Sequence, residues 1–156
     1  MRYITLFFLA LMLMACGGSK TVRTSKKVIK GDWQLNNISY SQAGTYNVTL
    51  LNDAPKACFE NSTWNFIPNN NTGTYILSGP DCNVDQRYFV FTIDEVNEDT
   101  GLYDFLIKPT DRKNKSETNN GFRLQLTSLS ETNMQWQQTV SVDGSPFTIT
   151  MNFIKQ

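Results

Sequence analysis

The feature of this sequence that most constrains its fold is an alternation of apolar and polar residues with a period of two, repeated along residues 31–156. Successive side chains of a β strand point to opposite faces, so this alternation predicts strands with one buried face. Phe122, Leu124 and Leu126 are the clearest example, because polar residues separate them. Beyond residue 31 no stretch keeps a helical apolar period for three turns. The sequence therefore predicts an all-β domain.

Turn-forming residues separate the alternating segments and predict hairpins. Asp143 and Gly144 stand between two such segments, and further turns are expected at residues 69–73 and 97–101. Residues 46–50 suggest one more strand, and the charged residues 108–120 suggest a mobile loop. We predict an antiparallel meander of eight to nine strands, because closing it into a barrel hides both its apolar face and its edges. A two-sheet β-sandwich is the alternative.

The N-terminal residues have the pattern of an export signal. Arg2 precedes an apolar segment at residues 4–14, which is much shorter than the roughly 20 residues that a membrane-spanning helix needs. Residues 13–16 (LMAC) then resemble the lipobox of bacterial lipoproteins. The resemblance implies that residues 1–15 are a lipoprotein signal peptide and that Cys16 is the lipidated first residue of the mature chain. We therefore expect an envelope protein attached to a membrane through the Cys16 lipid anchor.

The residues after Cys16 suggest which membrane and what kind of tether. Gly17 follows the cysteine where an aspartate would favour the inner membrane, so the resemblance implies the outer membrane of a Gram-negative bacterium. Residues 16–30 carry five basic residues and no acid, and we expect a basic tether there. Two interpretations remain open, a solvated, disordered linker or contact with anionic lipid headgroups. The domain at residues 31–156 is correspondingly acidic, which argues against nucleic acid as a partner.

Composition also limits the chemistry. The chain has no histidine, which excludes histidine-based catalysis and histidine-ligated metals. Cys58 and Cys82 are expected to form a disulfide, because the exported compartment permits oxidation and two thiols alone make a poor metal site. We predict no catalytic residues, metal or cofactor, and no enzymatic activity.

A family resemblance appears at the start of the predicted domain. Gly31 and Trp33 form the Gly-x-Trp motif that is similar to the opening of lipocalin barrels. Together with the lipobox, the cysteine pair and the closing meander, the chain resembles the lipocalin-like lipoproteins of Gram-negative bacteria over most of residues 30–156. In that family a cation packs over the motif tryptophan, which we expect to plug the closed end of the barrel. Lys155 stands in the last strand in place of the arginine that usually packs over this tryptophan, and Arg123 is the candidate for the missing cation.

The resemblance implies that a small apolar or amphipathic ligand binds inside the barrel. An eight-stranded barrel either encloses one such ligand or is filled by its own side chains. In the second case it is a solid structural or interaction lipoprotein, whose loops bind another envelope protein or inhibit a hydrolase through residues 69–73 or 108–120. The candidate residues of the interior or pocket are large aromatic groups: Trp64, Phe66, Phe89, Phe91, Phe105, Phe122, Trp136, Phe147 and Phe153.

Overall fold

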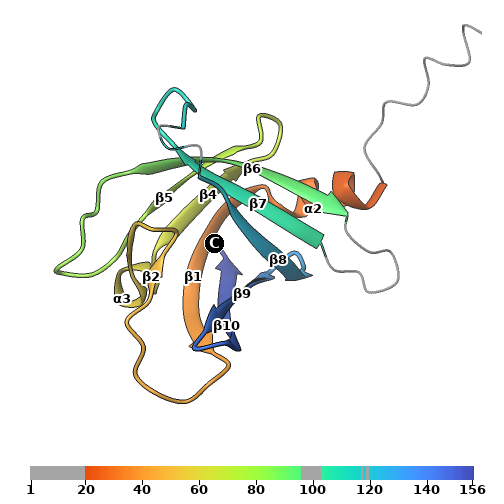
Figure 1. Ribbon diagram of the computed structural model, residues 1–156. Helices are drawn as coiled ribbons and strands as arrows, with labels where there is room; N and C mark the ends of the chain where they lie inside the picture. The colour runs from red at the N-terminus through yellow and green to blue at the C-terminus, as the bar shows by residue number, and fades with distance from the viewer. Residues whose placement is uncertain (1–19, 96–102, 117, 119) are drawn as a thin grey trace, which may run out of the picture.

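Eight antiparallel strands form a closed barrel in the computed structural model, which describes residues 20–95, 103–116, 118 and 120–156 (Figure 1). The barrel strands are, in chain order, β1 (Gly31–Tyr40), β4 (Thr63–Ile67), β5 (Thr72–Ile76), β6 (Arg87–Glu95), β7 (Tyr103–Thr110), β8 (Phe122–Leu129), β9 (Asn133–Val142) and β10 (Ser145–Lys155). A hairpin of β2 (Thr49–Leu50) and β3 (Ala54–Pro55) and the helices α2 (Lys20–Ile29) and α3 (Lys56–Phe59) lie outside it.

The meander closes through its first strand. From β4 to β10 each strand pairs with its neighbours in sequence, and β1 lies between the two ends of this series. Residues 31–34 of β1 pair with β4, while the other edge of β1 follows β10 as far as Tyr40. A register shift between Leu35 and Asn37 marks a bulge, which bends the strand where closure requires it. The prediction of an all-β meander barrel is confirmed, and the sandwich alternative is wrong.

Aromatic rings fill the middle of the barrel. Trp64 stacks on Tyr75 with a centroid distance of 4.4 Å and meets Trp136 edge to face at 5.4 Å. Phe105 stacks on Trp136 at 4.8 Å, and Phe153 lies 4.4 Å from the same indole. Every predicted interior aromatic residue is buried except Phe122, which is half-buried. Rings in mutual contact leave the central interior packed by the protein itself.

The Trp136 indole N–H lies in this core without a hydrogen-bond partner among the described residues. The rings of Trp64 and Phe66 stand nearly perpendicular to the indole, at centroid distances of 5.4 and 5.9 Å. Perpendicular rings are the arrangement in which an N–H can lie against an aromatic face, a weak but favourable contact. The aromatic surroundings thus suit the buried donor better than aliphatic side chains would.

Gly73 belongs to a strand rather than to the predicted turn at residues 69–73. Strand β5 begins at Thr72, and Gly73 pairs with Phe89 of β6. A Cβ atom at Gly73 would come within 2.3 Å of Cζ of the Phe89 ring. The ring therefore occupies the space that a side chain would take, and the glycine allows this close packing.

Helix α2 contradicts the interpretation of residues 16–30 as a disordered linker, at least for residues 20–29. The helix packs against one end of the barrel, where Ile29 is fully buried. The Trp33 indole Nε1 donates a hydrogen bond of 2.8 Å to the Ile29 carbonyl oxygen. Lys155 Nζ donates to the Val28 carbonyl oxygen at 2.6 Å. Sequence inspection missed this helix because its few apolar residues stand among lysines and become a buried face only against the barrel.

The motif tryptophan lies at the α2 end of the barrel, and the cation over its ring is Lys155. Trp33 is fully buried next to α2, and Lys155 Nζ lies 5.1 Å from the centroid of its ring. The expectation that Arg123 supplies this cation is wrong, because Arg123 forms an ion pair with Asp104 on the outer surface. Lys155 thus makes a cation–π contact with Trp33 and also binds α2.

None of the described helices is both long and apolar enough to span a bilayer.

Candidate binding site at the barrel mouth

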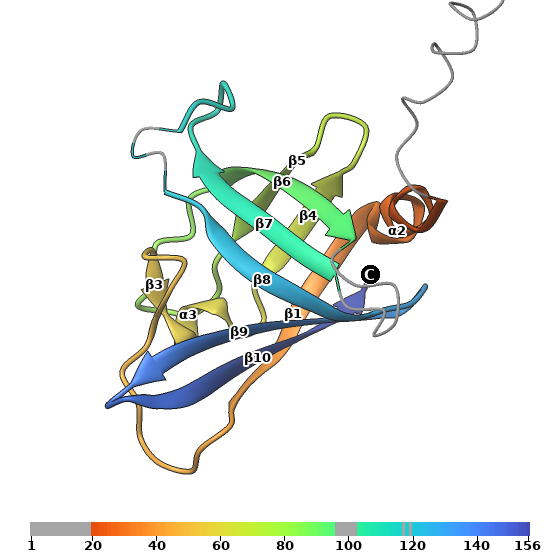
Figure 2. The ribbon, with the colours of Figure 1, turned by 45° about the vertical axis from the view of Figure 1, so that its right-hand side comes forward.

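The end of the barrel opposite α2 is bordered by loops, and we call it the mouth. Residues 41–55, 77–86 and 111–116 border it, together with Thr118, Asn120 and Gly121. In Figure 2, α2 lies beside the C-terminus at one end, whereas α3, β3 and the turn between β9 and β10 lie at the other. Only Thr49 and Leu50 of the strand predicted at residues 46–50 are extended, and they pair with β3 outside the barrel. This part of the prediction is wrong because the segment covers the mouth instead of joining the sheet.

A disulfide cross-links two of the segments at the mouth. Cys58, in α3, is bonded to Cys82 in the segment at residues 77–86, with a Cα–Cα distance of 5.6 Å. The Ser78 backbone N–H also donates to the Cys58 carbonyl oxygen at 2.9 Å. Phe59, next along α3, is buried against Trp64 and Tyr75. The predicted disulfide is confirmed, and it links α3 to the segment at residues 77–86.

We expect replacement of both Cys58 and Cys82 by serine to lower the free energy of unfolding by about 3–4 kcal/mol, because the unfolded chain loses a cross-link. Urea denaturation of the variant and of the wild type measures the difference. As an independent check, thiol titration of the denatured, unreduced mature protein should detect no free thiol. Two free thiols in freshly exported protein would contradict the disulfide in the cell.

The first cavity at the mouth has a volume of about 550 Å³ and a polar cluster in its wall. Asp53 accepts a hydrogen bond of 2.7 Å from the Tyr75 hydroxyl and forms an ion pair of 2.5 Å with Arg87 Nε. The Arg87 Nη1 group donates to the carbonyl oxygens of Asn83 and Asp85, both at 2.8 Å. The guanidinium is thus held by several partners at once, and the cluster is preorganised.

The buried Tyr75 hydroxyl remains a donor in this cluster. Burial raises the pKa of Tyr75, and its hydrogen bond to the Asp53 carboxylate raises this pKa further. Loss of the proton would leave two negative charges side by side in a poorly solvated place. Tyr75 therefore keeps its proton over the physiological pH range and fixes the orientation of the Asp53 carboxylate.

The second cavity, of about 320 Å³, has a more apolar wall. It adjoins the first, because Leu51, Asn52 and Phe122 line both. The remaining residues of its wall are mostly apolar or aromatic: Tyr46, Asn47, Val48, Thr49, Gln138, Val140, Val142, Phe147 and Ile149. Charged side chains are absent from this set, whereas the first cavity includes Asp53 and Arg87. The mouth therefore offers a polar compartment beside an apolar one.

Two residues that line both cavities have an unusual backbone conformation. Leu51 and Asn52 have φ angles of 50° and 53°, and the Asp53 N–H donates to the Leu50 carbonyl oxygen at 2.9 Å. The left-handed region suits asparagine but is unfavourable for a bulky residue such as leucine, at a cost of roughly 1–2 kcal/mol. Strained residues of this kind concentrate at functional sites. The strained residue Leu51 lies in the wall of both cavities, which supports this part of the mouth as the candidate site.

The β9–β10 hairpin extends past the barrel and forms part of the apolar cavity. Strand β9 pairs with β8 only as far as Gln137, whereas its pairing with β10 continues to Val142. Val140, which alternation places on the buried face, is therefore 37% exposed. The prediction for this residue fails because the hairpin has no third strand beside it at that point.

The candidate pocket residues separate into two groups. Phe122 and Phe147 line the mouth cavities, while the rings of Trp64, Phe66, Phe89, Phe91, Phe105, Trp136 and Phe153 contact one another in the core. Sequence reasoning missed Asp53 and Arg87, which are far apart in sequence and carry no motif. Asparagine at position 52 was the one available signal of a turn. Cys16, the predicted lipidation site, lies outside the described residues.

No protein-family model matches the chain, and no curated protein matches it.

Proposed function

We propose that this protein is a lipid-anchored, lipocalin-like binding protein of the bacterial cell envelope that holds a small amphipathic ligand at the mouth of its barrel. The observation that carries the proposal is the pair of adjoining cavities, one with a polar cluster and one mostly apolar, which share Leu51, Asn52 and Phe122. A single ligand can extend across this shared wall. Its polar group then meets the Asp53–Arg87 pair, and its apolar part lies along β9 and β10.

The mouth is a better candidate than the barrel interior for such a ligand. The first cavity, at about 550 Å³, falls within the range of roughly 300–1,000 Å³ that small-molecule sites occupy. The interior is occupied by contacting aromatic rings, and opening it would break those contacts. The family resemblance suggested a ligand enclosed inside the barrel. The proposed ligand binds instead at the open end of the barrel.

The anchor and the place in the cell are proposed from the sequence. A lipobox-like LMAC segment ends at Cys16, and Gly17 follows it. Acylation of Cys16 would hold the protein in a membrane, and the resemblance favours the outer membrane of a Gram-negative bacterium. Binding rather than catalysis is proposed, because the chain lacks histidine and the Asp53 carboxylate is already engaged by Tyr75 and Arg87.

We expect Val140→Asp to weaken binding of a dansyl-labelled fatty acid by about tenfold or more, because it places a charge in the wall of the apolar cavity. Val140 is 37% exposed, so the substitution leaves the core unchanged. Ile154→Asp is the matched control, since Ile154 is 41% exposed in the neighbouring strand β10 and lies outside both mouth cavities. Fluorescence titration of the mature protein measures the affinity, and the control should bind like the wild type.

Equal loss of affinity in both variants would show that the probe binds elsewhere on the surface. A wild type that binds neither this probe nor other amphipathic probes saturably would refute ligand binding at the mouth. The probe serves only as a stand-in for the chemistry of the site, an apolar chain with one polar end.

A solid barrel that binds another envelope protein through its loops is the second candidate function. The packed aromatic core favours it, and Arg112, Lys113 and Lys115 are exposed beside the mouth. The two loops considered for inhibition of a hydrolase do not form one surface. The turn before β5 lies beside α2, where Lys26 Nζ donates to Asn71 Oδ1 at 2.7 Å, whereas residues 111–116 border the mouth.

A further inference from the structure

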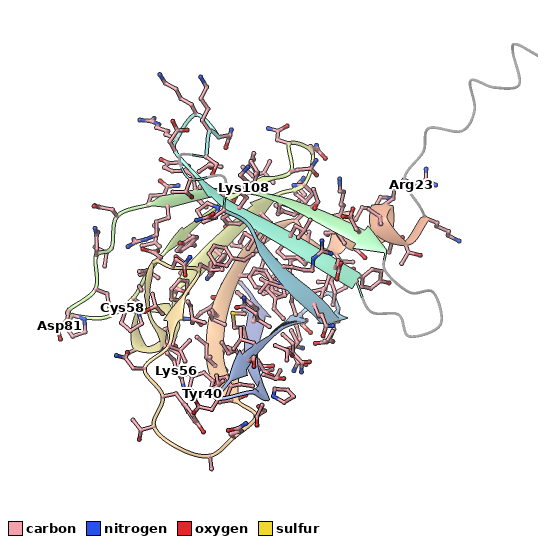
Figure 3. The ribbon with its side chains drawn as sticks, viewed as in Figure 1. Arg23, Tyr40, Lys56, Cys58, Asp81 and Lys108 are labelled. Carbon is pink, nitrogen blue, oxygen red and sulfur yellow. A yellow bond between two sulfur atoms is a disulfide. The ribbon has the colours of Figure 1, made fainter. Side chains whose placement is uncertain are left out.

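Helix α2 has two faces of opposite character. Ser25 and Ile29 are buried against the barrel. The exposed face carries four cations at intervals of three, four and three residues, which places them along one side of a helix and its continuation. We call these residues the basic stripe: Lys20, Arg23, Lys27 and Lys30. Figure 3 shows Arg23 on the outer side of the helix, away from the barrel.

The barrel fixes the direction in which the basic stripe faces. Trp33 and Lys155 each donate a hydrogen bond to a carbonyl oxygen in the last turn of α2. Lys26, on the flank of the helix, donates to Asn71 Oδ1 in the turn between β4 and β5. These three contacts come from separate parts of the barrel, so the helix cannot turn independently of it.

The stripe has no counter-ion within the part of the chain that the structure describes. The described ion pairs join Lys56 to Glu60, Arg87 to Asp53, and Arg123 to Asp104. Residues 16–30 contain no acid. Four unpaired cations on one solvent-facing side provide an electrostatic match for a surface of negative charge.

The short segment between Cys16 and α2 keeps the basic stripe close to the membrane when Cys16 is acylated. Only four peptide units separate Cys16 from Lys20, and a fully extended chain of that length spans at most about 14 Å. If the acyl chains of Cys16 are inserted in a bilayer, the first turn of α2 lies within that distance of the lipid headgroups. Anionic headgroups then lie within reach of the stripe.

We infer that the basic stripe docks the α2 end of the barrel on an anionic lipid surface and thereby turns the mouth toward the aqueous phase. The inference rests on the lipid anchor of the proposed function. A basic residue near an anionic membrane strengthens association by about fivefold. Because α2 and the mouth lie at opposite ends of the barrel, docking through the stripe keeps the two cavities accessible from water (Figure 2).

The test uses the mature, acylated protein reconstituted in vesicles of phosphatidylcholine, with or without phosphatidylglycerol. A fluorophore is attached through Thr24→Cys, on α2 beside the stripe, or through Asn114→Cys, at the mouth. Lipids with spin-labelled headgroups serve as quenchers. We expect the Thr24 position to be quenched several-fold more in the anionic vesicles. Quenching at Asn114 should be weak in both, and added salt should reduce the difference at Thr24.

Charge variants test whether the basic stripe causes the lipid-dependent quenching. Replacing Lys20, Arg23, Lys27 and Lys30 by glutamine should abolish the extra quenching at Thr24. Replacing Arg112, Lys113 and Lys115 by glutamine, at the exposed loop of the mouth, is the matched control and should preserve it. Equal quenching at Thr24 in both lipid mixtures, or an unchanged response in the stripe variant, would overturn the inference.

If Cys16 is not acylated, the vesicle experiments give a different result from that of an inert basic stripe. A protein without acyl chains would not float with pure phosphatidylcholine vesicles at all, whereas an acylated protein with an inert stripe would float but show no lipid-dependent quenching. Ligand binding at the mouth is measured separately with the dansyl fatty acid. The failure of each of the three hypotheses therefore gives a result that differs from the other two.

Discussion

Phe91→Ala is expected to lower the free energy of unfolding by about 3–5 kcal/mol. Phe91 is 2% exposed, and the ring centroids of Phe66, Phe89 and Phe105 lie 5.5–6.1 Å from its own. Removing the ring leaves a hole that these rigid neighbours cannot fill by small movements. The loss of dispersion contacts then adds to the loss of apolar burial.

Urea denaturation followed by tryptophan fluorescence measures this effect. Phe122→Ala is the matched control, because Phe122 is half-buried and already lines the mouth cavities. We expect a smaller loss of stability there, together with weaker binding of the dansyl fatty acid. A loss below about 1 kcal/mol for Phe91→Ala would mean that the interior is not close-packed, and a ligand enclosed in the barrel would then become the better hypothesis.

Cys16→Ser is expected to abolish acylation and release the protein from the membrane fraction. Attachment is proposed to depend on one thiol, since each buried CH₂ of an acyl chain contributes about 0.8 kcal/mol and several chains together make release negligible. Metabolic labelling with a radioactive fatty acid, followed by cell fractionation, tests both consequences.

Cys58→Ser is the control for this experiment. It removes a thiol that the structure places in a disulfide, and it should leave the lipid label in place. Undiminished label in the Cys16→Ser protein would refute the assignment of the anchor. Loss of label in both variants would instead indicate that the proteins are degraded before acylation.

The fold could be predicted because alternation acts over a few residues. Strand β8 is an example, since Leu124 and Leu126 are buried and Arg123 and Gln125 are exposed, as their order in the sequence requires. Once several such strands follow one another through tight turns, only a few topologies hide the apolar face. The cysteine pair was predictable for a similar reason, because few partners were available to each thiol.

The errors occur where burial depends on a distant part of the chain. Ile29 is buried because the end of the barrel lies beneath α2. Val140 is exposed because the pairing of β9 with β8 stops at Gln137, before the β9–β10 hairpin ends. Residues 46–50 alternate like a strand but cover the mouth. Local patterns report which side of an element is apolar, but they do not report what lies opposite that side.

The sequence by itself determined the strand content, the meander, the cysteine pair and the aromatic character of the interior, because each follows from residues close together or from composition. Only the tertiary structure decided that the rings pack against one another, that Asp53 meets Arg87, and that the basic stripe faces outward from the barrel. Closing the barrel sets these distances, since it brings together strands that are far apart in the chain. The candidate site at the mouth and the outward-facing basic stripe of α2 both follow from that closure.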